Sequence, residues 1–376
     1  MKQEAGNVQR QLRSLCAMAL LSPILRLIPG WAAQTGRAAW LGPLAALPAT
    51  LLFAWAIVRL RKTMQPGETL PELLLRRLGR RAGRLILLLL GAWLLLYCGF
   101  TLRACAQRFL VTVYPHSPPW FFLLTMGLLA LAAALHPLEH LMRTARIVEP
   151  LLLGVLGLIL LTALRSADPA ELLPLTAADA GPLLLSALPA LDIGCFGLTA
   201  FCFFCPAGSG KTIPARSGAL WLGGAALLLT ALGAAVQGHF GAALSERLAA
   251  PFFTLVRNLR FFHSLERIEA LVVGFWIFPD FLLAGLSLHG CQRCLRLALG
   301  WTPKETEPIL DLSRGRWLIW AGAAAALILG LLLGGDSAAM LFWSRRLIPS
   351  VSLGCAVLLV PGLLLAERLR RGPKTG

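Results

Sequence analysis

The chain has 376 residues, of which 57% are hydrophobic and 14% are charged, and its mean hydropathy is +0.72. A soluble domain is about half apolar and about one quarter charged, so this composition excludes an ordinary soluble enzyme. The net charge of +17 does not predict nucleic-acid binding, because the basic residues lie between apolar runs and not on one soluble face.

Ten apolar segments follow one another along the chain, separated by Pro, Gly and charged residues. Each approaches the roughly 20 residues that a helix needs to cross a bilayer. The predicted spans are 11–30, 38–60, 84–112, 117–136, 144–164, 182–206, 217–238, 266–290, 316–335 and 346–366. The start Met1–Arg13 is polar and basic but no cleavage site follows, so we expect the first span to be retained. Segment 239–262 mixes Phe with Arg and predicts an amphipathic helix at the membrane interface.

The distribution of Lys and Arg predicts the orientation in the membrane. Most of these 35 residues fall in the N-terminus, the C-terminus and the alternate loops that share their side, whereas the connection 165–181 is acidic. Loops rich in Lys and Arg stay in the cytoplasm, so we expect both termini to be cytoplasmic and the number of spans to be even. The basic connection 239–268 is the exception to this pattern.

Spans 1 and 6 contain residues that interrupt helices. The first holds Pro23 and Pro29-Gly30, and the sixth holds Pro189 and Gly194. Interrupted helices at matching positions of two halves are typical of transporters built from inverted repeats, with the substrate near the bilayer midplane. We therefore predict an all-α integral membrane fold of about ten helices in one domain. Its first five-helix repeat covers about 11–164, its second covers about 182–366, and a tail follows at 367–376.

Asp192 is the most informative single residue for function. An acid within a membrane helix costs a few kcal/mol, so it usually faces a cavity, an ion or a partner. It could bind a substrate ammonium group or carry a coupling proton, and it could equally pair with Arg26 or Arg103. The sequence leaves these alternatives open.

Two other motifs resemble known functional sites, but their context does not support those functions. Gly208–Thr212 reads like the end of a phosphate-binding loop, but Cys205 stands where the first glycine is required and no strand precedes it. Two Cys-x-x-Cys pairs, Cys202/Cys205 and Cys291/Cys294, are far apart in the sequence, and packing explains them better than a zinc or redox site. We expect no catalytic residue, metal or cofactor. An enzyme that uses nucleotides is the weakest hypothesis.

The sequence resembles the spore germination permeases, the B-type membrane subunits of nutrient germinant receptors, within the amino acid/polyamine/organocation transporter superfamily. The clearest stretch is Leu265–Leu271 followed by Trp276, which is similar to a Glu-Arg-x-Glu…Trp pattern at span 8. Further matching stretches are Ile28-Pro29 with Trp40, Thr101–Ala104 with Ser117-Pro118, and Leu138-Glu139 with Arg146.

This resemblance implies a LeuT-like fold, a location in the inner spore membrane, and a ligand pocket among spans 1, 3, 6 and 8. It also implies a small nutrient ligand, typically an amino acid, and A-type and C-type partner subunits. Two positions depart from the family pattern: Ser22-Pro23-Ile24 replaces a glycine-containing stretch, and Ala200 replaces a Glu. The candidate ligand-binding residues are Ser22, Pro23, Ile24, Arg103, Asp192, Gly194 and Glu269.

Two functions compete on this basis. The first is a receptor subunit that binds a nutrient and triggers spore germination by changing conformation. The second is a secondary transporter of amino acids, coupled to protons or ions through Asp192.

Overall fold

The computed structural model describes residues 2–31, 36–173, 175–208, 215–248, 250–259, 268–301, 316–333 and 337–370. Within these ranges, every regular element is a helix. The side chains of 2–7, 26–31, 177, 215–217, 246, 268–271, 316, 337–338 and 368–370 lie outside the described part.

The first half of the chain contains five long helices: α1 (Lys2–Trp31), α2 (Gly42–Arg61), α3 (Leu70–Thr112), α4 (Pro119–Leu135) and α5 (Leu138–Ser166). Short 3-10 turns at Arg37–Leu41, Pro169–Glu171 and Ala177–Asp179 precede α2 and α6.

The second half contains α6 (Ala180–Phe204), α7 (Ala215–Arg247), α8 (Pro251–Asn258), α9 (Ile268–Phe275), α10 (Ile277–Leu299), α11 (Arg316–Leu332), α12 (Ser337–Phe342) and α13 (Ile348–Arg370). A π-helical turn, Trp343–Leu347, joins α12 to α13.

The ten predicted spans all correspond to helices. Seven described helices are long and apolar enough to cross a membrane, and α4 and α11 are shorter apolar helices of 17 residues each. The remaining span is α1, and α9 and α10 together form span 8. Apolar residues also face outward along these helices, as expected where lipid replaces water.

The prolines of spans 1 and 6 lie inside continuous helices. α1 runs through Pro23 and α6 runs through Pro189 without an unwound segment. A proline removes one backbone hydrogen bond, and membrane helices tolerate this where neighbouring groups compensate. The interruption that we predicted is therefore a proline within each helix and not a gap between two half-helices.

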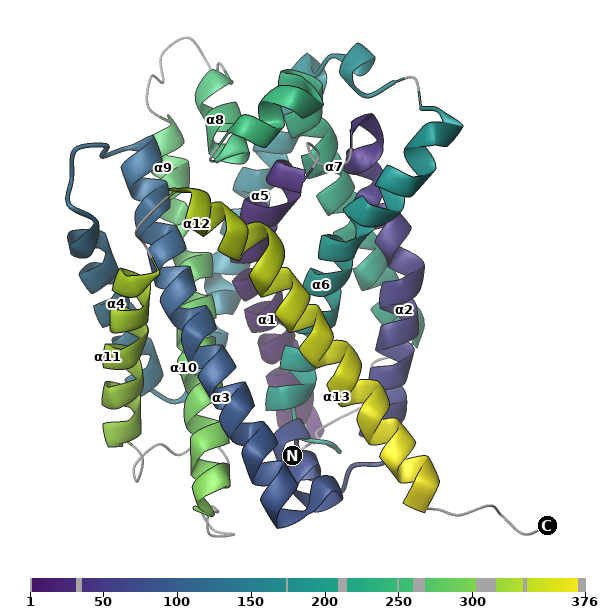
Figure 1. Ribbon diagram of the computed structural model, residues 1–376, viewed down its shortest axis with the longest axis vertical. Coiled ribbons are helices and arrows are strands. Elements are labelled where there is room, and N and C mark those ends of the chain that lie inside the picture. Colours follow the sequence, from purple (N-terminus) through teal and green to yellow (C-terminus); the bar gives the residue numbers. More distant parts are fainter. Residues whose placement is uncertain are drawn as a thin grey trace.

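The two halves are related in an inverted manner. A left-handed glycine breaks α3 at Gly79, with φ 78°, and α7 at Gly241, with φ 65°. The short helical segment before Gly79 lies at the end of the molecule that carries both termini, whereas α8 lies at the opposite end (Figure 1). The start of α1 and the end of α13 lie at the same end of the molecule, as an even number of spans requires.

α8 corrects one prediction. The segment is amphipathic, but its apolar residues Phe252, Phe253, Leu255 and Val256 are buried in the protein and not in a lipid interface. The rings of Phe252 and Phe253 pack against the ring of Trp276, which lies between α9 and α10. The helix therefore covers the bundle from above in Figure 1.

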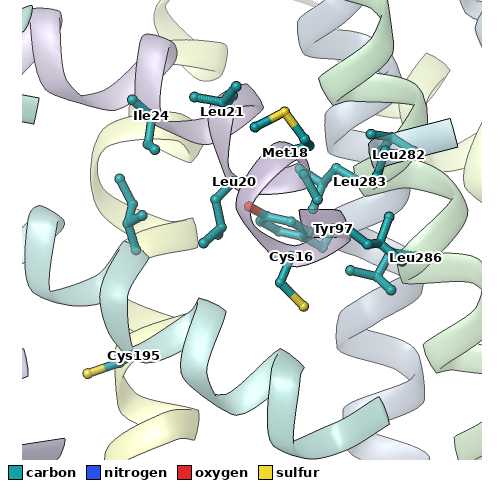
Figure 2. Close-up of a cluster of buried hydrophobic side chains, with 14 of the residues drawn as sticks. Cys16, Met18, Leu20, Leu21, Ile24, Tyr97, Cys195, Leu282, Leu283 and Leu286 are labelled. Atoms are coloured by element: carbon teal, nitrogen blue, oxygen red, sulfur yellow. The ribbon is translucent and has the colours of Figure 1, made fainter. Parts of the chain in front are cut away.

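The core of the molecule lies where α3 packs along α10 and α1 packs among α5, α6, α7 and α10. Figure 2 shows Cys16 and Met18 of α1 and Leu283 and Leu286 of α10 around the buried ring of Tyr97. Apolar packing of this kind holds membrane helices together through van der Waals contact.

Candidate functional site

A partly open cavity of about 70 Å³ lies between α3, α6, α10 and α13, beside the C-terminal half of α6. A water needs about 10–15 Å³ on this measure, so the cavity holds roughly five to seven water-sized groups. Its lining residues are Leu90, Trp93, Leu94, Phe196, Thr199, Ala200, Phe203, Phe204, Leu283, Leu286, Ser287, Ser352, Cys355, Ala356 and Leu359.

The polar side-chain groups of this lining are three hydroxyls, the Cys355 thiol and the Trp93 indole N–H. Ser287 Oγ donates to the carbonyl oxygen of Leu283 at 2.7 Å, one turn earlier in α10. Thr199 Oγ1 and Ser352 Oγ are buried and make no hydrogen bond with the described residues. Unsatisfied buried hydroxyls are costly, so these two are the groups that a ligand would satisfy.

A buried ion pair lies on the outer side of the cavity, toward α8. Arg108 of α3 donates to Asp280 of α10 from Nη1 to Oδ2 at 2.5 Å and from Nη2 to Oδ1 at 3.3 Å. Ser22 of α1 donates to Asp280 Oδ1 at 2.5 Å. The carboxylate therefore joins three helices, and a two-pronged guanidinium–carboxylate pair is among the strongest polar contacts in proteins.

Aromatic rings of α8 close this network. The Arg108 guanidinium lies 5.1 Å from the ring centroid of Phe253, within the range of a cation–π contact. Phe252 and Phe253 in turn pack on Trp276, with ring centroids 5.5 and 6.1 Å away. Ser22, Arg108, Asp280 and these rings are called the outer network below.

A second polar cluster, the inner network, lies at the end that carries the chain termini. Glu68 pairs with Arg76 at 2.6 Å, and Arg293 Nη2 donates to Thr69 Oγ1 at 2.9 Å and to Glu72 Oε1 at 3.0 Å. These contacts tie the start of α3 to α10.

The inner network also reaches α6 and α13. Arg61 donates to the carbonyl oxygens of Cys205 and Pro206 at 2.9 and 3.2 Å. Backbone hydrogen bonds of 2.7 Å join residues 67–68 to Ala207, and Arg77 pairs with Glu367 at 3.6 Å. Burial would raise the pKa of Glu68, but the Arg76 guanidinium and the Gln65 N–H together hold it below its ordinary value.

The cavity lies between the two networks along α10. Asp280 and Arg293 are thirteen residues apart, about 20 Å in a helix, and the lining residues Leu283–Ser287 lie between them. Polar contacts thus cross the bundle on both sides of an apolar cavity.

The structure separates the predicted site residues. Ser22 belongs to the outer network, with Pro23 and Ile24 buried beside it in α1. Asp192 is buried in α6 without a hydrogen bond or ion pair among the described residues, so it does not pair with Arg103. The side chains of Arg26 and Glu269 lie outside the described part.

Three further predictions have structural outcomes. Arg103 is buried in α3. Gly194 packs against α2, where a Cβ would lie 2.7 Å from Thr50 Cγ2. Of the phosphate-loop-like motif only Gly208 is described, since 209–214 lie outside the described residues.

Sequence reasoning missed Arg108 and Asp280. Both lie within predicted spans, so the rule that singled out Asp192 applied to them equally. Their spacing of 172 residues gave no sign that they meet.

The helical bundle and its two inverted halves define a membrane protein with a transporter fold. The sequence model of the spore germination protein family, a permease family, matches residues 9–310, and the chain belongs to this family.

The solved structure of Mhp1 has the same fold. It is a nucleobase-cation-symport-1 family transporter in a closed conformation with bromovinylhydantoin bound, and it is similar with a TM-score of 0.60. The identity is 14%, and the match covers 96% of this chain and 79% of the transporter. A search of curated proteins found no match.

Proposed function

We propose that the chain is the permease-like membrane subunit of a spore germinant receptor and binds a small nutrient of amino-acid size in the cavity between α3, α6, α10 and α13. The observation that supports this most strongly is the cavity itself, placed between the outer and inner networks. A ligand that binds one arrangement of the helices more tightly shifts the population toward it. Such a shift would be the signal that starts germination.

The orientation proposed for this subunit follows from its charge, and its membrane and partners follow from its family. The exposed residues Arg76, Arg80 and Arg81 lie at the end that carries both termini, which we assign to the cytoplasm. The membrane is the inner spore membrane, and the partners are A-type and C-type receptor subunits.

Ligand-dependent thermal stability tests the proposal. We expect at least one small nutrient to raise the unfolding temperature of the purified chain in nanodiscs, because binding to the folded state stabilises it. Ala200→Phe, which fills the cavity, should abolish that rise and the germination response of spores that carry it. Gly154→Ala, where the structure places no atom within 4 Å of the new Cβ, is the control. Unchanged responses in the Ala200→Phe variant would refute the site.

Active secondary transport is the alternative function, and one observation favours it. The buried carboxyl of Asp192 has no partner among the described residues, and such a group is suited to carry a coupling proton or ion. Uptake by proteoliposomes that contain only this chain distinguishes the functions. Robust uptake that Asp192→Asn abolishes would establish the transporter and reject a purely sensory role.

A further inference from the structure

The chemistry of the cavity wall limits the charge of its ligand. None of the fifteen lining residues carries a charge, and apart from hydroxyls their polar side-chain groups are the Cys355 thiol and the Trp93 indole N–H. Two of these hydroxyls, those of Thr199 and Ser352, have no hydrogen-bond partner among the described residues and can bond to a ligand.

The backbone of the wall adds no free donor. The lining positions of α3, α10 and α13 lie inside helices and those of α6 reach its last turn, and at all of them the N–H is bonded to a carbonyl one turn earlier. A carboxylate bound in this cavity would thus meet neither a cation nor a row of backbone N–H groups among the described residues.

Burying an unpaired charge costs far more than a small ligand can recover from apolar contact. A zwitterion would bring two such charges into the cavity. Asp192 lies one helical turn from Phe196 and is the nearest acid along α6, but it does not line the cavity.

We infer that the cavity of this chain selects an uncharged, largely apolar molecule of about five to seven non-hydrogen atoms with a carbonyl, amide or hydroxyl group. This inference rests on the proposed function and narrows its ligand class. Thr199 and Ser352 donate to the polar group of the ligand, and Trp93, Phe196 and Leu286 contact its hydrocarbon part. Ala200, which stands where the family pattern has a Glu, keeps the wall neutral.

Three probes of nearly equal size and different charge test this inference. They are propionamide, which is neutral, L-alanine, which is a zwitterion, and isopropylamine, which is a cation at pH 7. Unfolding temperature is measured for the full chain in nanodiscs across a concentration series of each. We expect propionamide alone to give a saturable rise of roughly 2 °C at ten times its dissociation constant.

Two variants locate the effect. Thr199→Val keeps the shape of the side chain and removes the hydroxyl, so it should weaken the propionamide midpoint roughly threefold to tenfold. Thr125→Val makes the same change on the exposed face of α4, where the hydroxyl bonds to Phe121 O, and should leave the midpoint unchanged.

The outcomes separate this inference from the proposed function. Stabilisation by L-alanine that Ala200→Phe abolishes would overturn the neutral ligand and keep the nutrient site. Stabilisation by isopropylamine that Asp192→Asn abolishes would also overturn it and assign the charge to Asp192. Stabilisation by none of the three would refute the neutral ligand, and failure across all nutrients would reject the proposed function as well.

Discussion

Arg108 and Asp280 form a two-pronged ion pair between α3 and α10, in which the buried carboxylate also accepts a hydrogen bond from Ser22 of α1. Only 1% of the Asp280 surface is exposed, so water does not screen the pair. Each partner neutralises a buried charge that would strongly destabilise the folded protein if it were left unpaired. The pair therefore holds the outer ends of three helices in one arrangement.

Removal of one partner should destabilise the protein strongly. We expect Arg108→Met to lower the free energy of unfolding by about 3–5 kcal/mol, because it leaves the Asp280 carboxylate buried and unpaired. Chemical unfolding in mild detergent measures the change. The double variant Arg108→Met/Asp280→Leu should recover much of the loss, since neither charge is then left. A double variant as unstable as the sum of the single changes would contradict the pairing.

The membrane fold was predictable because hydrophobicity alone specifies it. Each span of apolar residues, such as 144–164, must satisfy its own backbone as a helix, so counting apolar runs counts helices. The docking of α8 was not predictable, because its amphipathic pattern fits a lipid interface and a protein surface equally well. Tertiary contact with Trp276 decides between them.

Close packing between α3 and α11 depends on two glycines. A Cβ at Gly99 would lie 2.7 Å from the Ala326 carbonyl oxygen, and a Cβ at Gly330 would lie 3.0 Å from the Gly99 carbonyl oxygen. We expect Gly99→Ala to destabilise the protein by about 1–3 kcal/mol, because the backbones must move apart. Thermal unfolding measures this.

The control for this prediction is again Gly154→Ala, in the α5 helix, with no neighbour within 4 Å. There the gain in helix propensity should leave stability equal or higher by about 0.5–1 kcal/mol. Equal losses in both variants would show that backbone approach is not the cause.

The inner network should make stability depend on pH. The pKa of Glu68 in the folded protein is below its ordinary value of 4.5, chiefly because Arg76 opposes the effect of burial. The contribution of Glu68 to stability is therefore complete above about pH 4.5 and is lost as the pH falls through the folded pKa. The difference in unfolding temperature between the wild type and Glu68→Gln should shrink from pH 7 to pH 3. A constant difference would contradict the role of the carboxylate.

The candidate site was predictable only in part. Intramembrane charge pointed to Asp192 and Arg103, and the family resemblance pointed to Ser22. The cavity, however, is built by residues such as Leu90 and Phe203 that look like ordinary packing in the sequence. A void depends on how side chains from four helices fit together. Neither hydrophobic periodicity nor motif spacing contains that information.

Asp192 and Asp280 are two buried acids with opposite surroundings, and the same isosteric change should affect them in opposite ways. Asp280→Asn leaves the Arg108 charge buried without a counter-charge and should lower the free energy of unfolding by at least about 3 kcal/mol. Asp192→Asn removes an acid that has no partner among the described residues, so stability should stay equal or rise by about 1 kcal/mol. Unfolding of both variants under identical conditions tests the contrast. A large loss in Asp192→Asn would show that the acid is held by a structural partner and would remove the reason to place an ion or proton there.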